Sequence, residues 1–475
     1  MGEFLDWEAE ALVAAMRERR LSCEEVMAAT LNRVDGLNPG LNAIISRRET
    51  EDLLSEARAA DRVPVEARGA LHGLPMAVKD FASVKGVPTS MGSSLFAETP
   101  APQDDVMVAR MRGAGAIFIG KTNVPEFGLG SHTFNPVFGA THNPYDHAKS
   151  AGGSSGGAAA ALAARMVALA DGSDMMGSLR NPAGFCNIYG FRPSWGVVPR
   201  DAGGETFLQQ ISTNGPMARS PGDLALLLSV IAAPNPKVPH NVPVQEWTLG
   251  PQPRLRGVRV GWLGDWGGAY AMEDGILALC EAGLGVLEDL GAGVETLPAP
   301  MAAERLWESW CTLRHWAVAT ELAPLHADTR KRAALKAEAI WEIEAGLKLD
   351  AMAISRAGAA RARWFERAAD LFESYDVLAL PTAQVWPFPV EWRFPEAIGA
   401  REMDTYHRWM EVVVPASLAG LPAISVPVGF GEAGLPMGMQ LIARKGADRA
   451  LLEVAEAYHR ATHWPEQRPQ IFPDA

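Results

Sequence analysis

Cysteine is scarce in this sequence of 475 residues, which contains four: Cys23, Cys186, Cys280 and Cys311. They lie far apart and form neither a CxxC pair nor a dense framework. This pattern excludes a small disulfide-stapled scaffold and a zinc site built from paired thiols. We therefore expect reduced thiols in a protein of the cytoplasm.

Positive charge is also in deficit. The chain has 43 Lys and Arg residues against 56 Asp and Glu residues, which gives a net charge of -13. Because binding to phosphates requires concentrated positive charge, this balance excludes nucleic acid and anionic lipid surfaces as partners. The basic run at residues 330–332 is predicted to be an exposed helix face, since Asp328 and Glu338 dilute its charge.

Long apolar runs and metal-binding motifs are missing as well. No stretch of about 18 uninterrupted apolar residues is present, and the acidic residues Glu3 and Glu8 stand where a secretory signal would be basic. His459 and His463 stand four apart, but no glutamate follows the first. We expect a protein that is neither exported nor membrane-bound, with no metal and no other cofactor.

The composition is otherwise that of an ordinary globular protein, with 48% hydrophobic and 21% charged residues and no linker dividing it. We therefore treat residues 1–475 as a single domain. Apolar residues recur at helical spacing between about residues 7 and 34, which predicts two helices. Ser22 is the predicted N-cap of the second helix.

The middle of the chain alternates between strand and helix patterns. Strands are predicted at residues 74–78 and 116–119 with a helix at 106–111 between them, which favours a parallel or mixed sheet covered on both faces. A buried helix is predicted at residues 158–169, which are apolar apart from Arg165. Loops rich in Gly and Ser surround it, as is typical where the backbone approaches a ligand.

Tryptophan is concentrated in the later part of the chain, where helices are predicted at residues 272–290 and 302–371 and a strand at 377–380. Eight of the 14 tryptophans lie between Trp307 and Trp409. Side chains of this size either pack a hydrophobic layer or line an apolar pocket, and packing is favoured for any single one. We predict that the helical, Trp-rich segment 300–410 sets substrate specificity.

Three segments carry candidate chemistry: residues 73–80 with Lys79, the glycine-serine loop 152–157, and residues 174–182 with Ser178. The loop 152–157 formally matches GxSxG around Ser155, but residues 147–151 do not resemble the strand that a nucleophile elbow requires. A phosphate-binding loop is excluded because no lysine follows Gly157.

Taken together, these segments resemble the amidase signature family, whose members use a Ser-Ser-Lys triad. The resemblance is dense over a core of about 65–225 and looser toward the C-terminus. Further matching segments are residues 123–127 (Asn-Val-Pro-Glu-Phe), 139–144 (Gly-Ala-Thr-His-Asn-Pro), 189–194 (Tyr-Gly-Phe-Arg-Pro-Ser), 215–220 (Gly-Pro-Met-Ala-Arg-Ser) and 415–427. The fold that it implies is one α/β/α domain with a large central mixed β-sheet flanked by helices.

The resemblance implies that Lys79 is the base, Ser154 the bridging serine and Ser178 the acylated nucleophile, with a cis peptide bond before Ser154. A lysine with a pKa of about 10.4 is almost fully charged at neutral pH. It can accept a proton only if burial lowers that pKa, and the apolar residues 74–78 offer such surroundings.

The amides of Met175, Met176, Gly177 and Ser178 are the candidates for an oxyanion hole. Asp174 and Arg180 are expected to brace this turn by pairing with each other or with nearby backbone. By resemblance, Gly128 and Leu129 lie near the substrate.

One position departs from the family pattern, because Met176 stands where relatives commonly have glycine. Methionine would be strained there if the backbone required a positive φ, and would otherwise narrow the pocket. We favour the second interpretation.

The function expected from the resemblance is hydrolysis of a linear, non-peptide amide through an acyl-enzyme on Ser178. The predicted substrate is a small aryl or alkyl carboxamide. Two alternatives stay open: the amidase subunit of a tRNA-dependent glutamine amidotransferase, which needs a partner protein, and a catalytically silent binding protein on the same scaffold. The oligomeric state is also open, with a homodimer as one option.

Overall fold

The computed structural model describes residues 3–201, 205–243, 245–250 and 255–471. Its centre is an eight-stranded mixed sheet in the order β12-β11-β13-β17-β16-β9-β10-β8. Strand β11 pairs in parallel with β12 and β13, and the other neighbours are antiparallel. The strands are β8 (Leu169–Asp174), β9 (Tyr189–Arg192), β10 (Thr213–Ala218), β11 (Arg259–Trp262), β12 (Gly293–Thr296), β13 (Val377–Pro381), β16 (Ala423–Phe430) and β17 (Pro436–Ala443).

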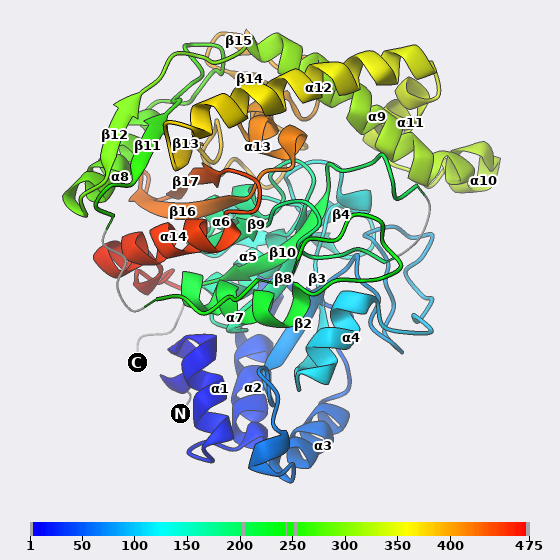
Figure 1. Ribbon diagram of the computed structural model, residues 1–475. Helices are drawn as coiled ribbons and strands as arrows, with labels where there is room; N and C mark the ends of the chain where they lie inside the picture. Colours follow the sequence, from blue (N-terminus) through cyan, green and yellow to red (C-terminus); the bar gives the residue numbers. More distant parts are fainter. Residues whose placement is uncertain (1–2, 202–204, 244, 251–254, 472–475) are drawn as a thin grey trace.

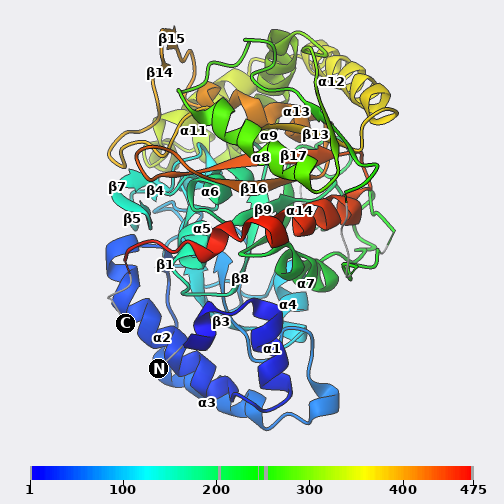
Figure 2. The ribbon, with the colours of Figure 1, turned by 90° about the vertical axis from the view of Figure 1, so that its left-hand side faces the viewer.

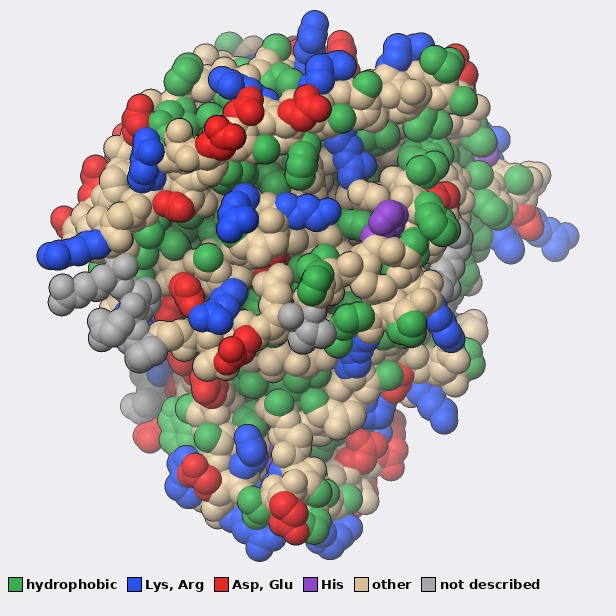
Figure 3. Space-filling model, viewed as in Figure 1, with side chains coloured by type: hydrophobic (Ala, Val, Ile, Leu, Met, Phe, Trp, Pro, Cys, Tyr) green, Lys and Arg blue, Asp and Glu red, His purple; other side chains and the backbone are tan. Residues whose placement is uncertain are grey.

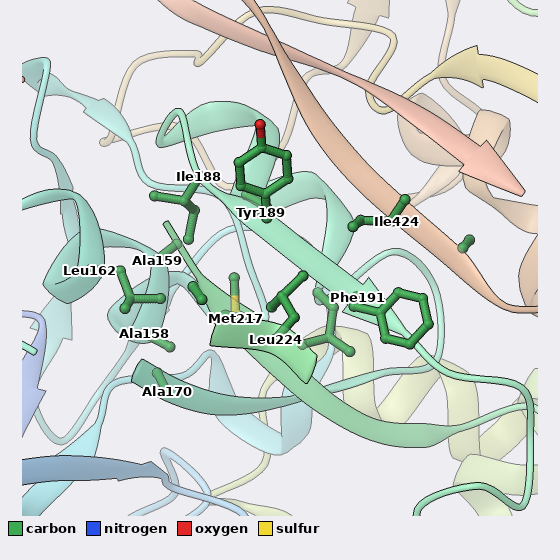
Figure 4. Packing of buried hydrophobic residues seen from close by; sticks show 14 of the residues in the cluster. Ala158, Ala159, Leu162, Ala170, Ile188, Tyr189, Phe191, Met217, Leu224 and Ile424 are labelled. Atoms are coloured by element: carbon green, nitrogen blue, oxygen red, sulfur yellow. The ribbon is translucent and has the colours of Figure 1, made fainter. Parts of the chain in front are cut away.

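Helices cover both faces of this sheet, which confirms the predicted α/β/α architecture. On one face lie α7 (Pro221–Ile231), α8 (Ile276–Asp289) and α14 (Asp448–Thr462), and on the other α5 (Gly156–Ala163) and α6 (Arg180–Phe185). Figure 4 shows the apolar layer between them, where Ala159 of α5 and Met217 of β10 lie close together. All eight residues of α5 are buried, so its small side chains let the helix pack tightly between neighbours.

A second, three-stranded sheet lies beside β8. It has the order β1-β3-β2 and consists of β1 (Ile44–Ile45), β2 (Pro75–Lys79) and β3 (Ile117–Thr122). Strands β2 and β3 are parallel and are joined through α4 (Val106–Gly113), which confirms the predicted strand, helix and strand. Short hairpins add β4 (Phe134–Asn135) with β5 (Gly139–Ala140), β6 (His142–Asn143) with β7 (Asp146–Ser150), and β14 (Ala397–Ile398) with β15 (Arg401–Glu402).

Three N-terminal helices, α1 (Ala9–Arg17), α2 (Cys23–Leu41) and α3 (Thr50–Asp61), lie at one end of the molecule (Figure 1 and Figure 2). The first two confirm the helices predicted between residues 7 and 34. Ser22 caps α2 as expected, and its hydroxyl accepts from the amide of Glu25, whose carboxylate accepts from the amide of Ser22 in return.

The helix predicted at residues 158–169 is wrong in its second half. Helix α5 ends at Ala163, Arg165 has a left-handed φ of 56°, and Leu169 already begins strand β8. An apolar run fits a buried helix and a buried strand equally well, and the antiparallel ladder between β8 and β10 decides in favour of the strand. Residues 147–151 were also misjudged, because most of them belong to strand β7.

The helical segment 300–410 forms a layer at the opposite end from α1–α3 (Figure 1). It contains α9 (Ala303–Ala327), α10 (Thr329–Arg332), α11 (Ala337–Gly346) and α12 (Ala351–Phe372), followed by α13 (Val414–Ala419). Trp310, Trp364 and Trp409 are at most 1% exposed and belong to the hydrophobic core. The tryptophans therefore serve packing, as was favoured for any single one.

The surface and the thiols agree with the composition. On the face shown in Figure 3, Lys and Arg side chains are interspersed with Asp and Glu side chains. Residues 330–332 are exposed on α10, as predicted. All four cysteines are free thiols. Within the described ranges, none of the helices is long and apolar enough to cross a membrane.

Candidate active site

Lys79 is the last residue of β2, and its side chain is 1% exposed. Its Nζ lies 2.8 Å from Ser154 Oγ, 2.8 Å from Ser155 Oγ and 2.9 Å from Ser173 Oγ. Three hydroxyl groups therefore converge on one buried amine.

Burial lowers the pKa of Lys79 to about 7, and the negative charges of Asp171 and Asp174 offset part of that shift. A substantial fraction of the amine is therefore neutral near pH 7 and can accept a proton. This is the property that the sequence analysis required of a lysine base.

Ser154 and Ser155 lie in the loop between β7 and α5, and the Gly153–Ser154 peptide bond is cis. Ser155, which the sequence analysis set aside, is as close to Lys79 Nζ as Ser154 is. A strand precedes this loop and a helix follows it, yet Ser155 is fully buried and is not presented to a substrate as in a nucleophile elbow. Its amide donates to the carbonyl of Ser178 at 3.2 Å. This bond ties the loop to the turn that bears Ser178.

Ser178 follows strand β8 and is 7% exposed. It lines the same cavity as Lys79 and Ser154. Among the described residues, its hydroxyl has no hydrogen-bond partner, so no direct bond joins it to Ser154. The structure thus brings all three predicted residues to one cavity and hydrogen-bonds two of them to each other.

Asp174 organises the turn that leads to Ser178. Its carboxylate accepts from the amides of Gly177 and Leu179 and forms ion pairs with Arg180 and Arg192, at 3.0 and 3.1 Å. Burial alone would raise the pKa of Asp174, but the two guanidinium groups hold it well below its usual range. The predicted pairing of Asp174 with Arg180 is present, and Arg192 is a partner that the sequence analysis missed.

The amides of this turn are not equivalent. The N–H of Gly177 is already bonded to Asp174. The amides of Met175, Met176 and Ser178 have no acceptor within the part of the chain that the structure describes. Three of the four predicted donors are therefore free to bind an anionic oxygen, and Gly177 instead shapes the turn with a φ of +78°.

Met176 meets neither of the two expectations for it. Its φ is not positive, whereas that of the next residue, Gly177, is, so methionine is not strained there. Its side chain is 2% exposed and packs in the hydrophobic core, and the side chain that lines the cavity is that of Met175. The favoured prediction that Met176 narrows the pocket is therefore wrong, because the turn directs its side chain into the core.

The cavity has a volume of about 320 Å³, within the range of small-molecule sites. Gly128 and Leu129 line it, as the resemblance implied. A Cβ at Gly128 would lie 3.6 Å from Ser154 Oγ and 3.1 Å from the Phe81 ring, so this position has little room for a side chain. The other apolar lining residues are Phe81, Ala82, Met91, Met107, Phe127, Met175, Val318 and Leu322.

Segment 300–410 contributes to this cavity through α9 and not through its tryptophans, none of which is among the lining residues that the structure describes. Arg314, Val318 and Leu322 lie on the cavity wall. At the start of α11, Lys336 Nζ donates to the carbonyl of Leu129 at 2.6 Å. The helical layer thereby holds a loop that lines the cavity.

Ser155, Ser173 and Asp171 are the site residues that sequence reasoning missed. Asp171 accepts the backbone N–H of Lys79 at 3.1 Å, and burial raises its pKa to about 6. A carboxylate in the otherwise uncharged first half of β8 was a signal that could have found it. Among the described residues there is no group of three or more His, Cys, Asp or Glu side chains that could hold a metal.

Comparisons with known proteins agree with this geometry. The family model described as Amidase matches residues 25–452. An acylamidase from Rhodococcus erythropolis is 32% identical over 475 residues, which cover 98% of each chain. The amidase-type chain of the glutamyl-tRNA(Gln) amidotransferase of Thermus thermophilus is 37% identical over 482 residues, covering 96% of this chain and 97% of that one.

The fold is shared with a solved structure as well. The crystal structure of a bacterial aryl acylamidase of the amidase signature enzymes matches with a TM-score of 0.90 and 28% identity, covering 98% of this chain and 99% of that one. Sequence and structure thus agree over almost the full length. The chain belongs to the amidase signature family.

Proposed function

We propose that this chain hydrolyses a carboxamide through an acyl-enzyme on Ser178, with Lys79 as the base and Ser154 as the bridge between them. By its family the chain is an amidase, a serine amidohydrolase that acts on carbon–nitrogen bonds. The observation that carries the assignment of roles is the buried Lys79 Nζ at 2.8 Å from Ser154 Oγ, at the wall of a cavity that Ser178 also lines.

In the proposed first step, neutral Lys79 takes the proton of Ser154 while Ser154 takes that of Ser178. The oxygen of Ser178 forms a bond to the amide carbon, and the carbonyl oxygen becomes an oxyanion. The carbon–nitrogen bond then breaks, and the proton passes back along the relay to the departing nitrogen. Water attacks the resulting ester along the same relay, which releases a carboxylic acid and restores Ser178.

The oxyanion needs fixed donors, and we assign the amides of Met175, Met176 and Ser178 to this role. Loss of one such donor typically costs about 3–4 kcal/mol of barrier. Gly177 is left out of the assignment because its N–H is already bonded to Asp174.

The proposed substrate is a small aryl or alkyl amide. Support comes from the volume of the cavity and its mainly apolar lining, and from the structural match to an aryl acylamidase. Because α9 supplies part of the wall, we propose segment 300–410 as the part that sets specificity within a single amidase domain spanning the chain. We also propose the cytoplasm as its location, which the four free cysteines support.

The test is release of amine or ammonia by the purified chain from a panel of aromatic, aliphatic and amino-acid amides. Wild-type protein should hydrolyse members of the panel, and Ser178→Ala should abolish the activity. Activity that survives this change would refute the assignment. A fluorophosphonate probe adds a second readout, because failure to label Ser178 in folded protein would instead support a silent binding protein.

A second candidate function is supported by the 37% identity to the amidase-type chain of a glutamyl-tRNA(Gln) amidotransferase. That function predicts a tightly bound partner protein, and glutamine hydrolysis that is weak without it. Purification of the chain from its native source, followed by a glutaminase assay, separates the two candidates. Activity on simple amides in the absence of any partner favours the hydrolase.

A further inference from the structure

The guanidinium of Arg314 forms part of the cavity wall although the residue is only 2% exposed. It projects from α9, and its Nη1 lies 3.4 Å from the sulfur of Met175. Met175 lines the same cavity three residues before Ser178. Arg314 is therefore a cationic donor close to the turn where the scissile amide is proposed to bind.

The hydrogen bonds of Arg314 leave part of its capacity unused. Nε donates to Glu342 Oε1 at 2.6 Å, Nη2 to Tyr406 Oη at 2.6 Å, and Nη1 to Met175. A guanidinium has five N–H bonds, so two have no acceptor among the residues that the structure describes. A buried donor without an acceptor costs about 1–3 kcal/mol, which a substrate oxygen would recover.

The guanidinium is also held rigidly. Glu342 accepts from Arg314, from Tyr406 Oη at 2.6 Å and from His315 Nδ1 at 2.6 Å. Burial alone would raise the pKa of Glu342, but Arg314 and His315 hold it well below its usual range. Glu342 therefore remains an anion beside Arg314, and the orientation of the free N–H bonds is fixed before substrate binds.

The charges around the cavity decide which acceptor fits. Glu342 already neutralises Arg314, and Asp105, Asp171, Asp201 and Glu321 also line the cavity. A carboxylate on the substrate would meet these negative charges, whereas a neutral carbonyl oxygen would accept the two N–H bonds without that repulsion.

We propose that Arg314 is a specificity-determining residue that donates to a second, neutral carbonyl-type oxygen of the substrate, distinct from that of the scissile amide. This inference rests on the proposed function and narrows its substrate class. The preferred substrates are amides with a further ketone, ester or amide carbonyl within reach of the cavity wall. Simple alkyl amides leave the two N–H bonds unpaired.

The test compares three anilides that share one leaving group: the pentanoyl, 4-oxopentanoyl and 3-carboxypropanoyl anilides. In wild-type protein, kcat/KM for the 4-oxopentanoyl compound should exceed that for the pentanoyl compound about tenfold or more. It should also exceed that for the carboxylate. A second pair, the acetyl amides of aniline and of 3-acetylaniline, places the added carbonyl on the amine side.

Two variants locate the preference at Arg314. Arg314→Gln combined with Glu342→Gln removes both charges together, and Arg314→Lys keeps the charge but loses the fork of donors. Both should lower the wild-type preference toward one, whereas Tyr406→Phe, whose side chain lies outside the cavity lining, should retain it. The ratio of two substrates is read within each variant, so a general loss of activity does not change it.

The outcomes are separable from those of the proposed function. A wild-type enzyme that hydrolyses every anilide without preferring a carbonyl in either pair overturns the role of Arg314 and leaves the amidase mechanism in place. A preference for the carboxylate overturns the choice of a neutral acceptor. Hydrolysis that survives Ser178→Ala refutes the mechanism itself.

Discussion

The carboxylate of Asp171 accepts the backbone N–H of Lys79 at 3.1 Å, and this bond joins β8 to β2 although the two strands belong to different sheets. A side chain thus takes the place of a backbone ladder bond at this junction. The bond fixes the end of the strand that carries the amine, and β8 itself leads directly to the turn before Ser178. Two parts of the site that are far apart in sequence are aligned by one buried group.

The activity of the enzyme should depend on pH through Lys79. The lowered pKa of about 7 means that the amine is charged below that pH and neutral above it, and the neutral form is the proposed base. We therefore expect kcat/KM to rise as the pH increases through about 7, measured as a pH-rate profile on a neutral amide.

Asp171→Asn is the matched variant for this profile. It removes a negative charge that stabilises the charged lysine, while the amide oxygen can still accept the N–H of Lys79. The rising limb should therefore move to lower pH. A limb that stays in place would show that Lys79 does not control it.

The two serines beside Lys79 should differ in their contribution. Ser154 lines the cavity whereas Ser155 is fully buried, although both lie 2.8 Å from Nζ. Ser154→Ala should lower kcat by about 10² or more, as for loss of a proton-transfer group. Ser155→Ala should lower it only about tenfold, the equivalent of one hydrogen bond. Equal losses in steady-state assays would contradict the assignment of Ser154 as the bridge.

Asp174 should matter for stability as much as for activity. It is fully buried between Arg180 and Arg192, so Asp174→Asn leaves two cations without their counter-charge. We expect the free energy of unfolding to fall by about 3–5 kcal/mol, measured by chemical denaturation. Glu18→Gln is the control, because the exposed Glu18–Arg20 pair should contribute less than about 1 kcal/mol.

The adjacent methionines should separate packing from binding. Met176→Ala removes a core side chain and should lower the free energy of unfolding by about 2–5 kcal/mol. Met175→Ala removes part of the cavity wall and should raise KM for aromatic amides about tenfold with a smaller loss of stability. The reverse pattern would place Met176, and not Met175, at the substrate.

Sequence reasoning succeeded where the signal was local. The strand that ends at Lys79 and the helix cap at Ser22 follow from short patterns, and both are present. It failed at Leu169, because an apolar run is compatible with helix and strand and only pairing with β10 decides between them. It also missed strand β7, whose polar residues form a strand only through pairing with β6.

The candidate site shows the same division. Motifs placed Lys79, Ser154 and Ser178, but the arrangement of hydroxyls around Nζ is tertiary, so nothing in the spacing of Ser155 or Ser173 pointed to it. The direction of the Met176 side chain was equally invisible in the sequence, because it depends on the turn that Asp174 holds.

The bond from Lys336 to the carbonyl of Leu129 and the contact of Arg314 with Met175 are made by helices that contribute none of the three residues of the proposed proton relay. The chain thus divides the labour between a fixed chemistry and an adjustable wall. Exchanges within residues 303–346 can retune which amide is accepted while leaving the bond-breaking apparatus as it is. Laboratory evolution toward new amides should therefore accumulate its changes on α9 and α11.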